Sequence, residues 1–160
     1  MAAQTGRTTK NWINFIIGDT SNVLRNIPVD SVNGVGFQYD EMDVTAFQDA
    51  VKNVLSALPD MTIEIKGPFD NSAAASTPTL SGSHTVISAI AGDNTPRSLD
   101  VQFGMRHAWT AGETQFGISR TATSGVHIVK YVVEPEKMQY SATIKVYGTT
   151  APAWGTAAET

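Results

Sequence analysis

Few residues in this chain have the types and spacing that acid–base or metal chemistry requires. The three histidines are His84, His107 and His127, and none has a carboxylate at the spacing of a metal ligand set. A structural role in a strand is therefore favoured for them over a catalytic or metal-binding role. The chain has no cysteine, which excludes thiolate metal sites and disulfides.

Motifs for hydrolase, nucleotide and calcium sites are missing or incomplete. There is no Gly-x-Ser-x-Gly element and no Gly-Lys-Ser/Thr phosphate loop. The stretch "NGVGF", residues 33–37, lacks the third glycine and the following helix of a dinucleotide site, so a turn or bulge is favoured. The acidic "YDEMD", residues 39–43, lacks the glycine and terminal glutamate of a calcium loop. We therefore expect a non-enzymatic protein with no catalytic residues, metal or cofactor.

The composition describes a chain of one domain's size that is poor in charge. Charged residues are 16% of the 160 residues, against about a quarter in an average globular domain. The net charge is −4 and the basic residues are scattered, which argues against tight nucleic-acid binding. No apolar run approaches the roughly 20 residues of a membrane span, and the polar N-terminus lacks the apolar stretch of a signal peptide. We expect a soluble protein made inside the cell, with no membrane partner.

Short strands separated by turn residues account for most of the chain. Residues 99–105 and 140–146 alternate apolar and polar side chains, which is the period of a half-buried strand. Other stretches of strand length lie at residues 11–17, 22–32, 35–39, 61–66, 84–92, 114–119 and 126–133. The pattern predicts a mostly β fold, an antiparallel β-sandwich or barrel formed by residues 11–148. Residues 1–10 are expected to form an N-terminal arm and residues 149–160 an extended tail, with Trp154 as a docking anchor.

One amphipathic helix is expected among the strands, at about residues 45–58. Thr45 and Gln48 have the spacing of a capping box. Apolar residues then recur at helical period until Pro59: Phe47, Ala50, Val51, Val54, Leu55 and Leu58. Because a helix with one apolar stripe needs a surface to cover, we expect it to flank the sheet.

Two of the expected strands are apolar on both faces. Residues 11–17 form one, and residues 126–133 form the other, with Val126, Ile128 and Val132 on one face and Val129, Tyr131 and Val133 on the other. A sheet that faces water on one side is polar there. We therefore expect copies of the chain to cover one another, although packing inside the sandwich could account for one of the two strands.

The stretch "DVTAFQDAVKNVLSALPDMTIEIKGPFDN", residues 43–71, resembles a segment of the major tail tube proteins of long-tailed bacteriophages. In that family, Asp-Val-Thr and an aromatic residue open a short helix, and a Leu-Pro-Asp-like turn, a Thr-Ile-x-Ile-x-Gly strand and Phe-Asp follow. The corresponding residues here are 43–45 with Phe47, then 58–60, 62–67 and 69–70. The later "YSATIKVYGT", residues 140–149, is similar to the closing strand of the family.

The resemblance implies a sandwich of two sheets with one flanking helix, assembled as hexameric rings. Stacked rings would form a helical, hollow tail tube, through which DNA passes transiently and without specific binding. The implied partners are further copies of the chain and the tape measure, terminator and baseplate proteins. The implied location is the tail of the virion, after assembly in the host cytoplasm. A tail terminator or completion ring, or a secretion-type tube subunit of the same fold, is the alternative; a ligand-binding sandwich or an enzyme is a weaker one.

Candidate site residues follow from this interpretation. A conduit must not bind DNA, so we expect the acids Glu64 and Asp100 to face the lumen; the alternative is that they are ordinary solvated charges of a strand face. The long loop at residues 70–83, together with the N-terminal residues, is the candidate contact between rings. Its candidate contact residues are Ser72, Thr77, Pro78 and Thr79. Deletion of residues 72–79 is expected to leave folded subunits that cannot polymerise.

Overall fold

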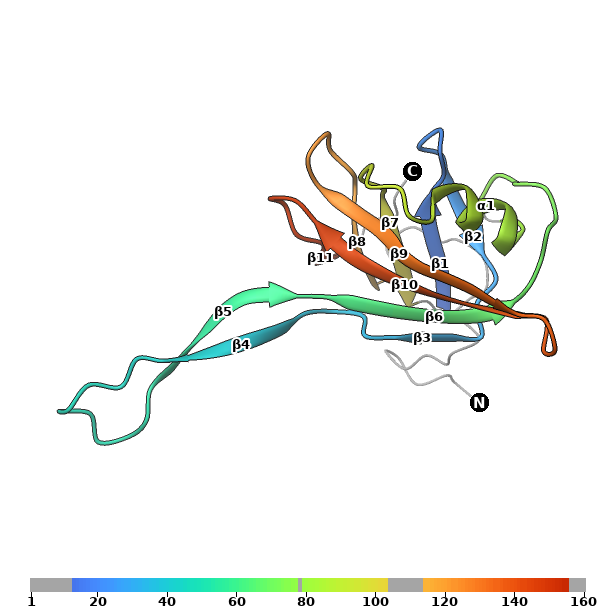
Figure 1. Cartoon of the computed structure of the whole chain (residues 1–160). Coiled ribbons are helices and arrows are strands. Elements are labelled where there is room, and N and C mark those ends of the chain that lie inside the picture. The colour runs from blue at the N-terminus through green and yellow to red at the C-terminus, as the bar shows by residue number, and fades with distance from the viewer. Residues whose placement is uncertain (1–12, 78, 104–113, 156–160) are drawn as a thin grey trace, which may run out of the picture.

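Two antiparallel sheets and one helix form the body of the protein, and a two-stranded arm projects from it (Figure 1). The computed structural model describes residues 13–77, 79–103 and 114–155. The mostly β, antiparallel fold with one helix confirms the predicted fold class, and the sheets of this described part do not close into a barrel. No helix within these residue ranges is long and apolar enough to cross a membrane.

The strands of the body belong to two sheets. The five-stranded sheet has the order β11-β8-β7-β1-β2, and its strands are β1 (Ile13–Gly18), β2 (Leu24–Ile27), β7 (Leu99–Phe103), β8 (Thr114–Ile118) and β11 (Ala153–Gly155). The four-stranded sheet has the order β3-β6-β10-β9, and its strands are β3 (Ser31–Asn33), β6 (Thr62–Pro68), β9 (Gly125–Glu134) and β10 (Gln139–Tyr147). All neighbouring strands in both sheets run antiparallel.

The hydrophobic core lies between the two sheets. Successive side chains of a strand face opposite sides, so alternate residues of each strand point inward. The five-stranded sheet contributes Phe15, Ile17, Ile27, Leu99, Val101, Phe116 and Ile118. The other sheet, with the residue just before β6, contributes Met61, Ile63, Ile65, Val126, Ile128, Tyr140, Ala142 and Ile144. The burial of β10 alternates as predicted. In β7 the predicted apolar residues Leu99 and Val101 enter the core, but the strand is not half-buried as expected, because Asp100 and Gln102 on its other face are buried too.

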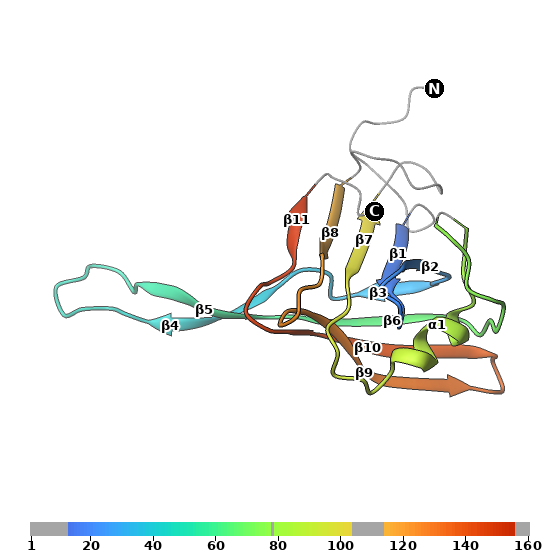
Figure 2. The same ribbon diagram turned by 90° about the horizontal axis from the view of Figure 1, so that it is seen from above.

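The helix α1 (Ser83–Ile90) packs against β9 and β2 and covers one side of the sandwich (Figures 1 and 2). Val86, Ile87 and Ile90 are buried in the core. The strand expected at residues 84–92 is therefore wrong. β-branched residues disfavour a helix only slightly, and the spacing of these three places them on one helical face. The side of the sandwich between the two sheets supplies the surface that this face needs.

The helix expected at residues 45–58 is also wrong, because the segment belongs to the projecting arm. In this arm β4 (Gln38–Asp43) pairs antiparallel with β5 (Val54–Asp60), with Asp43 opposite Val54 and Met42 opposite Leu55. A short helix gains most of its stability by packing its apolar stripe on the rest of the fold. Figures 1 and 2 show the arm standing clear of the body, where the same chain offers no such packing.

A β-bulge in β9 explains most of the two-sided apolar pattern of that strand. Ile144 lies opposite Ile128 but Thr143 lies opposite Lys130, so Val129 is an extra residue on β9. A bulge of one residue reverses which side chains point inward beyond it. Tyr131, opposite the buried Ala142, is therefore on the core side like Ile128. Val129 and Val132 are left exposed on the outer face, at 49% and 46%.

Part of the expected extended tail forms a strand. The three residues of β11 pair with β8, with Trp154 opposite Phe116. The Trp154 ring lies 4.9 Å from the ring of Phe116 and 5.7 Å from that of Phe103, centroid to centroid. Trp154 therefore anchors this segment to the five-stranded sheet of its own chain, and it keeps more than half of its surface exposed.

Candidate functional site

Chemically reactive groups do not gather anywhere in the described part of the chain. Residues 13–77, 79–103 and 114–155 hold no cluster of three or more side chains that could bind a metal. The Nδ1 atom of His84 lies 2.9 Å from the Tyr131 hydroxyl, and the His84 ring packs at a tilt against the ring of Phe69. His127 packs edge-on against Tyr147, and His107 lies outside the described residues. Surfaces, rather than reactive groups, are therefore the candidate functional features.

The arm, residues 38–60, is the most apolar exposed part of the described structure. Seven of the fourteen large apolar side chains that are exposed belong to it: Tyr39, Met42, Val44, Phe47, Val51, Val54 and Leu55. Phe47, at the tip, is fully exposed, and Val51 is 69% exposed. Large apolar patches on a folded subunit mark contacts with another molecule. The arm is therefore the first candidate assembly surface.

Hydrogen bonds hold the arm tip in one conformation. The Oγ1 atom of Thr45 accepts a hydrogen bond from the amide of Asn53 at 2.8 Å and donates one to Asp43. Asp49 accepts from the Ala46 amide and from the Asn53 side chain, both at 2.8 Å. The hydrogen bonds from Thr45 lower the pKa of the Asp43 carboxyl. Those from Ala46 and Asn53 lower the pKa of the Asp49 carboxyl. The tip thus presents Phe47 from an ordered turn, and the expected capping box is replaced by bonds across the hairpin.

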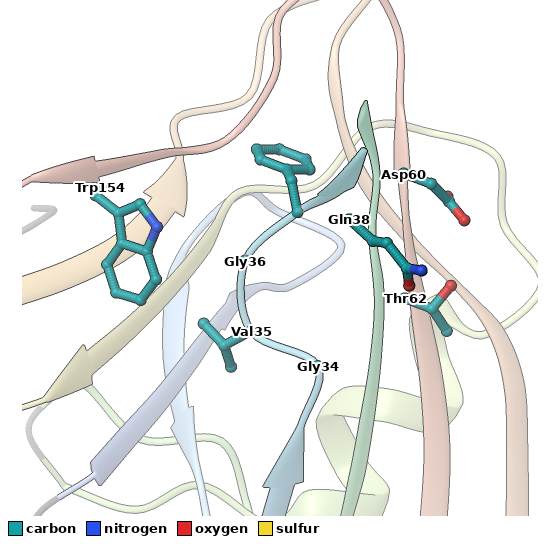
Figure 3. A pocket seen from close by; sticks show the side chains of 8 residues that line it. Gly34, Val35, Gly36, Gln38, Asp60, Thr62 and Trp154 are labelled. Atoms are coloured by element: carbon teal, nitrogen blue, oxygen red, sulfur yellow. The ribbon is translucent and has the colours of Figure 1, made fainter. Parts of the chain in front are cut away.

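Two glycines form the base of the arm, where the chain leaves β3. Gly34 has φ of +83° and Gly36 of +115°, which confirms the turn predicted for residues 33–37 and explains why the strand expected at residues 35–39 begins only at Gln38. A Cβ on Gly34 would lie 2.2 Å from the Thr62 carbonyl oxygen. Beside this turn is a pocket of about 470 Å³, with Trp154 on one side and Asp60 and Thr62 on the other (Figure 3).

The outer face of the four-stranded sheet is basic. Lys66, Lys130 and Lys145 lie on the side opposite the core. Lys66 and Lys145 alternate with buried residues, and Lys130 lies at the bulge of β9, opposite the outward-facing Thr143. Glu64 is on the same face, in one row with Thr143 and Lys130. The ion pairs found within the described residues involve none of these three lysines. Their charge is therefore available to a partner.

The two acids expected in a lumen lie on opposite sides of the sandwich. Glu64 is exposed on the outer face of the four-stranded sheet. Asp100 is in the five-stranded sheet, between the core residues Leu99 and Val101, so its side chain is on the outer face of that other sheet. It is fully buried and accepts a hydrogen bond at 3.4 Å from Nε2 of the Gln102 side chain. A lumen lined by one sheet could therefore contain Glu64 or Asp100 but not both. Which of the two acids faces a lumen stays a prediction.

The loop expected to join rings is tied to the body at its two ends. Ser72 donates to Asp70, and the Ser72 carbonyl accepts from the Thr85 hydroxyl on α1 at 2.7 Å. The amide of Ser81 donates to the Asn26 carbonyl of β2 at 2.7 Å. Thr77 is half-buried and Thr79 is exposed, whereas Pro78 and the N-terminal residues lie outside the described residues. Since Ser72 helps to hold α1, deletion of residues 72–79 would disturb the body as well as the loop.

The comparisons with known proteins identify the fold. Neither protein-family models nor curated protein sequences match the chain. Among solved structures, a chain of the anti-feeding prophage cap, described as a tube terminating cap, matches with a TM-score of 0.62 and 11% identity, covering 98% of this chain and 95% of that one. A chain of the sheath/tube terminator of an extracellular contractile injection system matches with a TM-score of 0.57 and 12% identity, over 96% and 99%.

A third match comes from the sheath–tube complex of the same kind of injection system. Its TM-score is 0.54 at 12% identity, over 96% of this chain and 94% of that one. At such low identity the likeness shows a shared fold. All three structures come from tail-like assemblies, the setting that the resemblance at residues 43–71 implies, and the likeness does not single out the major tail tube family.

Both candidate surfaces escaped sequence reasoning, each for its own reason. The apolar residues of the arm have the spacing of a helix, so they were expected to cover a sheet. The lysines of the outer face alternate with Ile65, Ile128 and Ile144, but they are far apart in the sequence. Only the pairing of β6, β10 and β9 brings the lysines onto one face. One signal could have predicted the hairpin of the arm. The polar side chains of Asp43, Thr45 and Asn53 suit the hydrogen bonds of a turn as well as those of a helix N-terminus.

Proposed function

We propose that this chain is a structural subunit of a phage-like tail or injection apparatus, and that it forms the ring that terminates or caps the tube. The observation that carries this proposal is the arm, whose seven exposed apolar side chains can be covered only by another molecule. The fold shared with chains of a tube terminating cap and of a sheath/tube terminator, over nearly the full length, supports the choice of assembly.

The geometry of a projecting arm suits a ring. An arm that binds a different surface on the next copy makes a head-to-tail contact, and such contacts close into a ring when the rotation between copies permits. We propose a hexameric ring, located in the tail, whose partners are further copies of the chain and the last ring of the tube. In this role the chain needs no catalytic group, and DNA passes through the ring without specific binding.

A tube subunit is the second candidate. The match to a chain of a sheath–tube complex favours it, as does the resemblance at residues 43–71 to tail tube proteins. The same head-to-tail contact, combined with stacking through the loop that contains Ser72, Thr77, Pro78 and Thr79, would give an open-ended tube. Glu64 would then be the better of the two candidates for the lumen, because Asp100 is buried in the subunit.

Electron microscopy of the purified protein, together with mass photometry over a range of concentrations, tests the proposal. Closed rings support the terminator, and long hollow tubes support the tube subunit. A double variant, Phe47→Ser with Val51→Ser, is expected to stay folded and to lose the assembly. The matched control is Val23→Ser, which removes an exposed apolar side chain outside the arm. A stable monomer at every concentration would contradict both candidates.

The contact between rings is tested with substitutions rather than with the deletion of residues 72–79. Thr77→Arg with Thr79→Arg adds bulk and charge to the loop without removing the Ser72 bonds to Asp70 and Thr85. If the loop joins rings, this variant forms single rings but no tubes. Tubes of normal length from the variant would exclude the loop as the stacking contact.

A further inference from the structure

We propose that the arm of one copy binds the outer face of the four-stranded sheet of a second copy, with the arm's acids against Lys66, Lys130 and Lys145. The contact rests on the proposed function, because it specifies how copies of this chain join. The two halves of the interface are an acidic, apolar arm and a basic, partly apolar sheet face.

The two surfaces have opposite charge. Between residues 38 and 60 the arm carries five acids and one lysine: Asp40, Glu41, Asp43, Asp49 and Asp60, with Lys52. Hydrogen bonds keep Asp43 and Asp49 in the charged form, since they lower both pKa values. The sheet face carries three lysines and two acids, Glu64 and Glu134. Glu134 is paired with Lys137, so among the described residues the unpaired charges of the face are the three lysines and Glu64. A negative surface that meets a positive one is favoured over like pairs, which repel.

Both surfaces also expose apolar side chains. Val129 and Val132 lie beside Lys130 on the outer face, because the bulge in β9 leaves them uncovered. On the arm, Phe47 and Val51 are the most exposed apolar residues. Burial of these side chains against one another would supply the attraction, and the charges would select the partner and its register.

The arm cannot reach this face within its own chain. β5 continues into β6 with only Met61 between them, so the arm extends the four-stranded sheet beyond its end. Figures 1 and 2 show the arm pointing away from β9 and β10 in both views. A second copy is therefore the partner that can bring an arm onto the face, and copies joined in this way make the head-to-tail contact of a ring.

A protein fits the basic face better than a nucleic acid does. Proteins that bind DNA neutralise phosphates with clustered lysine and arginine. Here Glu64 and two exposed valines interrupt the lysines. The chain as a whole is also acidic, at −4, which disfavours the approach of a polyanion.

Charge reversal on each surface, and on both together, tests the contact in the full-length protein. The face variant is Lys66→Glu with Lys130→Glu, and the arm variant is Asp40→Lys with Glu41→Lys. None of these four side chains is hydrogen-bonded in the described structure, so each variant is expected to fold. We expect each variant to weaken assembly by about tenfold or more, measured by analytical ultracentrifugation, and the combined variant to recover most of the loss.

Two controls separate this contact from a general effect of charge. Arg120→Glu makes a similar change in the loop between β8 and β9, outside both the arm and the outer face, and it is expected to leave assembly unchanged. Higher salt is expected to weaken the assembly of the wild-type protein, whose opposite charges attract, and to strengthen that of the face and arm variants, whose like charges repel, because salt screens the exposed charges.

The outcomes distinguish the contact from the proposed function. If the wild-type protein forms rings or tubes and both charge variants assemble as well as it does, the contact is wrong and the proposed function stands. The same holds if the fold-loss of assembly in the combined variant equals the product of the fold-losses in the two single-surface variants. If the wild-type protein never assembles, the proposed function fails and the contact with it. Binding of a short DNA duplex that is lost in the face variant would assign the basic face to nucleic acid and overturn the contact.

Discussion

The Oγ1 atom of Thr45 accepts a hydrogen bond from the backbone amide of Asn53 at 2.8 Å, and this bond joins the two strands of the arm beside its tip. In the expected helix the two residues would be about two turns apart. They lie instead across a hairpin, and the bond between them orders the turn that presents Phe47. The order of this turn matters for the proposed function, since an ordered surface loses less entropy when it binds a partner.

Thr45→Val is expected to loosen the arm tip and leave the body unchanged. The substitution keeps the shape of the side chain but removes the acceptor for the Asn53 amide. We expect hydrogen exchange at Asn53 to rise about fivefold, which corresponds to about 1 kcal/mol of local stability. Thr143→Val, on the face of β10, is the control and should not change exchange at Asn53. An unchanged rate in Thr45→Val would show that the bond does not hold the tip.

Alanine substitutions at Ile87 and Phe47 test whether the helix forms at residues 83–90, as in the structure, or at residues 45–58, as the sequence predicts. Ile87 is fully buried in α1, so Ile87→Ala is expected to cost about 3 kcal/mol in the free energy of unfolding. Phe47 is fully exposed, so Phe47→Ala is expected to change the stability of the monomer by less than about 0.5 kcal/mol. Urea denaturation of dilute protein measures both values. A large loss in Phe47→Ala would support the helix at residues 45–58 instead.

The hydroxyl of Tyr140 links the two halves of the fold. It donates a hydrogen bond of 2.8 Å to the Pro28 carbonyl between β2 and β3, while its ring is buried in the core. Tyr140→Phe leaves the packing intact and removes the donor, so we expect a loss of about 1 to 2 kcal/mol in the free energy of unfolding. Tyr39→Phe, which changes an exposed tyrosine on the arm, is the control and should have no such effect.

Stability is expected to fall at alkaline pH because of the same tyrosine. Burial raises the pKa of Tyr140 above its ordinary value of 10.0, and burial also raises the pKa of Tyr131. The folded protein therefore holds the phenol proton more tightly than the unfolded chain, and stability decreases as pH rises above about 10. Denaturation at about pH 8 and about pH 11 should show a smaller decrease for Tyr140→Phe than for the wild-type protein. Equal decreases would exclude Tyr140 as the group responsible.

Alanine substitutions at three glycines are expected to reduce stability by increasing amounts. Gly155→Ala places a Cβ in open space and should change stability by less than about 0.5 kcal/mol. Gly92 has φ of +76° with no atom near its Cβ position, so Gly92→Ala should cost about 1 kcal/mol of backbone strain. Gly34→Ala adds a contact of 2.2 Å with the Thr62 carbonyl to a φ of +83° and should cost about 3 kcal/mol or more. Thermal denaturation of the three variants checks this order.

The sequence by itself determined the fold class and most of the strands. In β10 the alternation of apolar and polar residues predicts both the strand and its buried side, because the period of two is a property of the local backbone. In β7 it predicts the strand and its core residues, but not the burial of Asp100 and Gln102 on the other face. The absence of spaced histidines, cysteines and phosphate loops likewise directs attention to surfaces rather than to reactive groups. Both kinds of inference depend only on neighbours in the chain.

The tertiary structure decided where the helix forms and which surfaces are open. Val86, Ile87 and Ile90 can serve a strand or a helix, and the side of the sandwich that they cover favours the helix. Phe47 and Val51 have the spacing of a helix too, but the arm carries them away from any surface of the same chain. The faces of Lys66, Lys130, Glu64 and Asp100 depend on strand pairing and on the bulge at Val129. Local periodicity predicts which side chains a segment could bury. Only the folded structure determines which surface, if any, covers them.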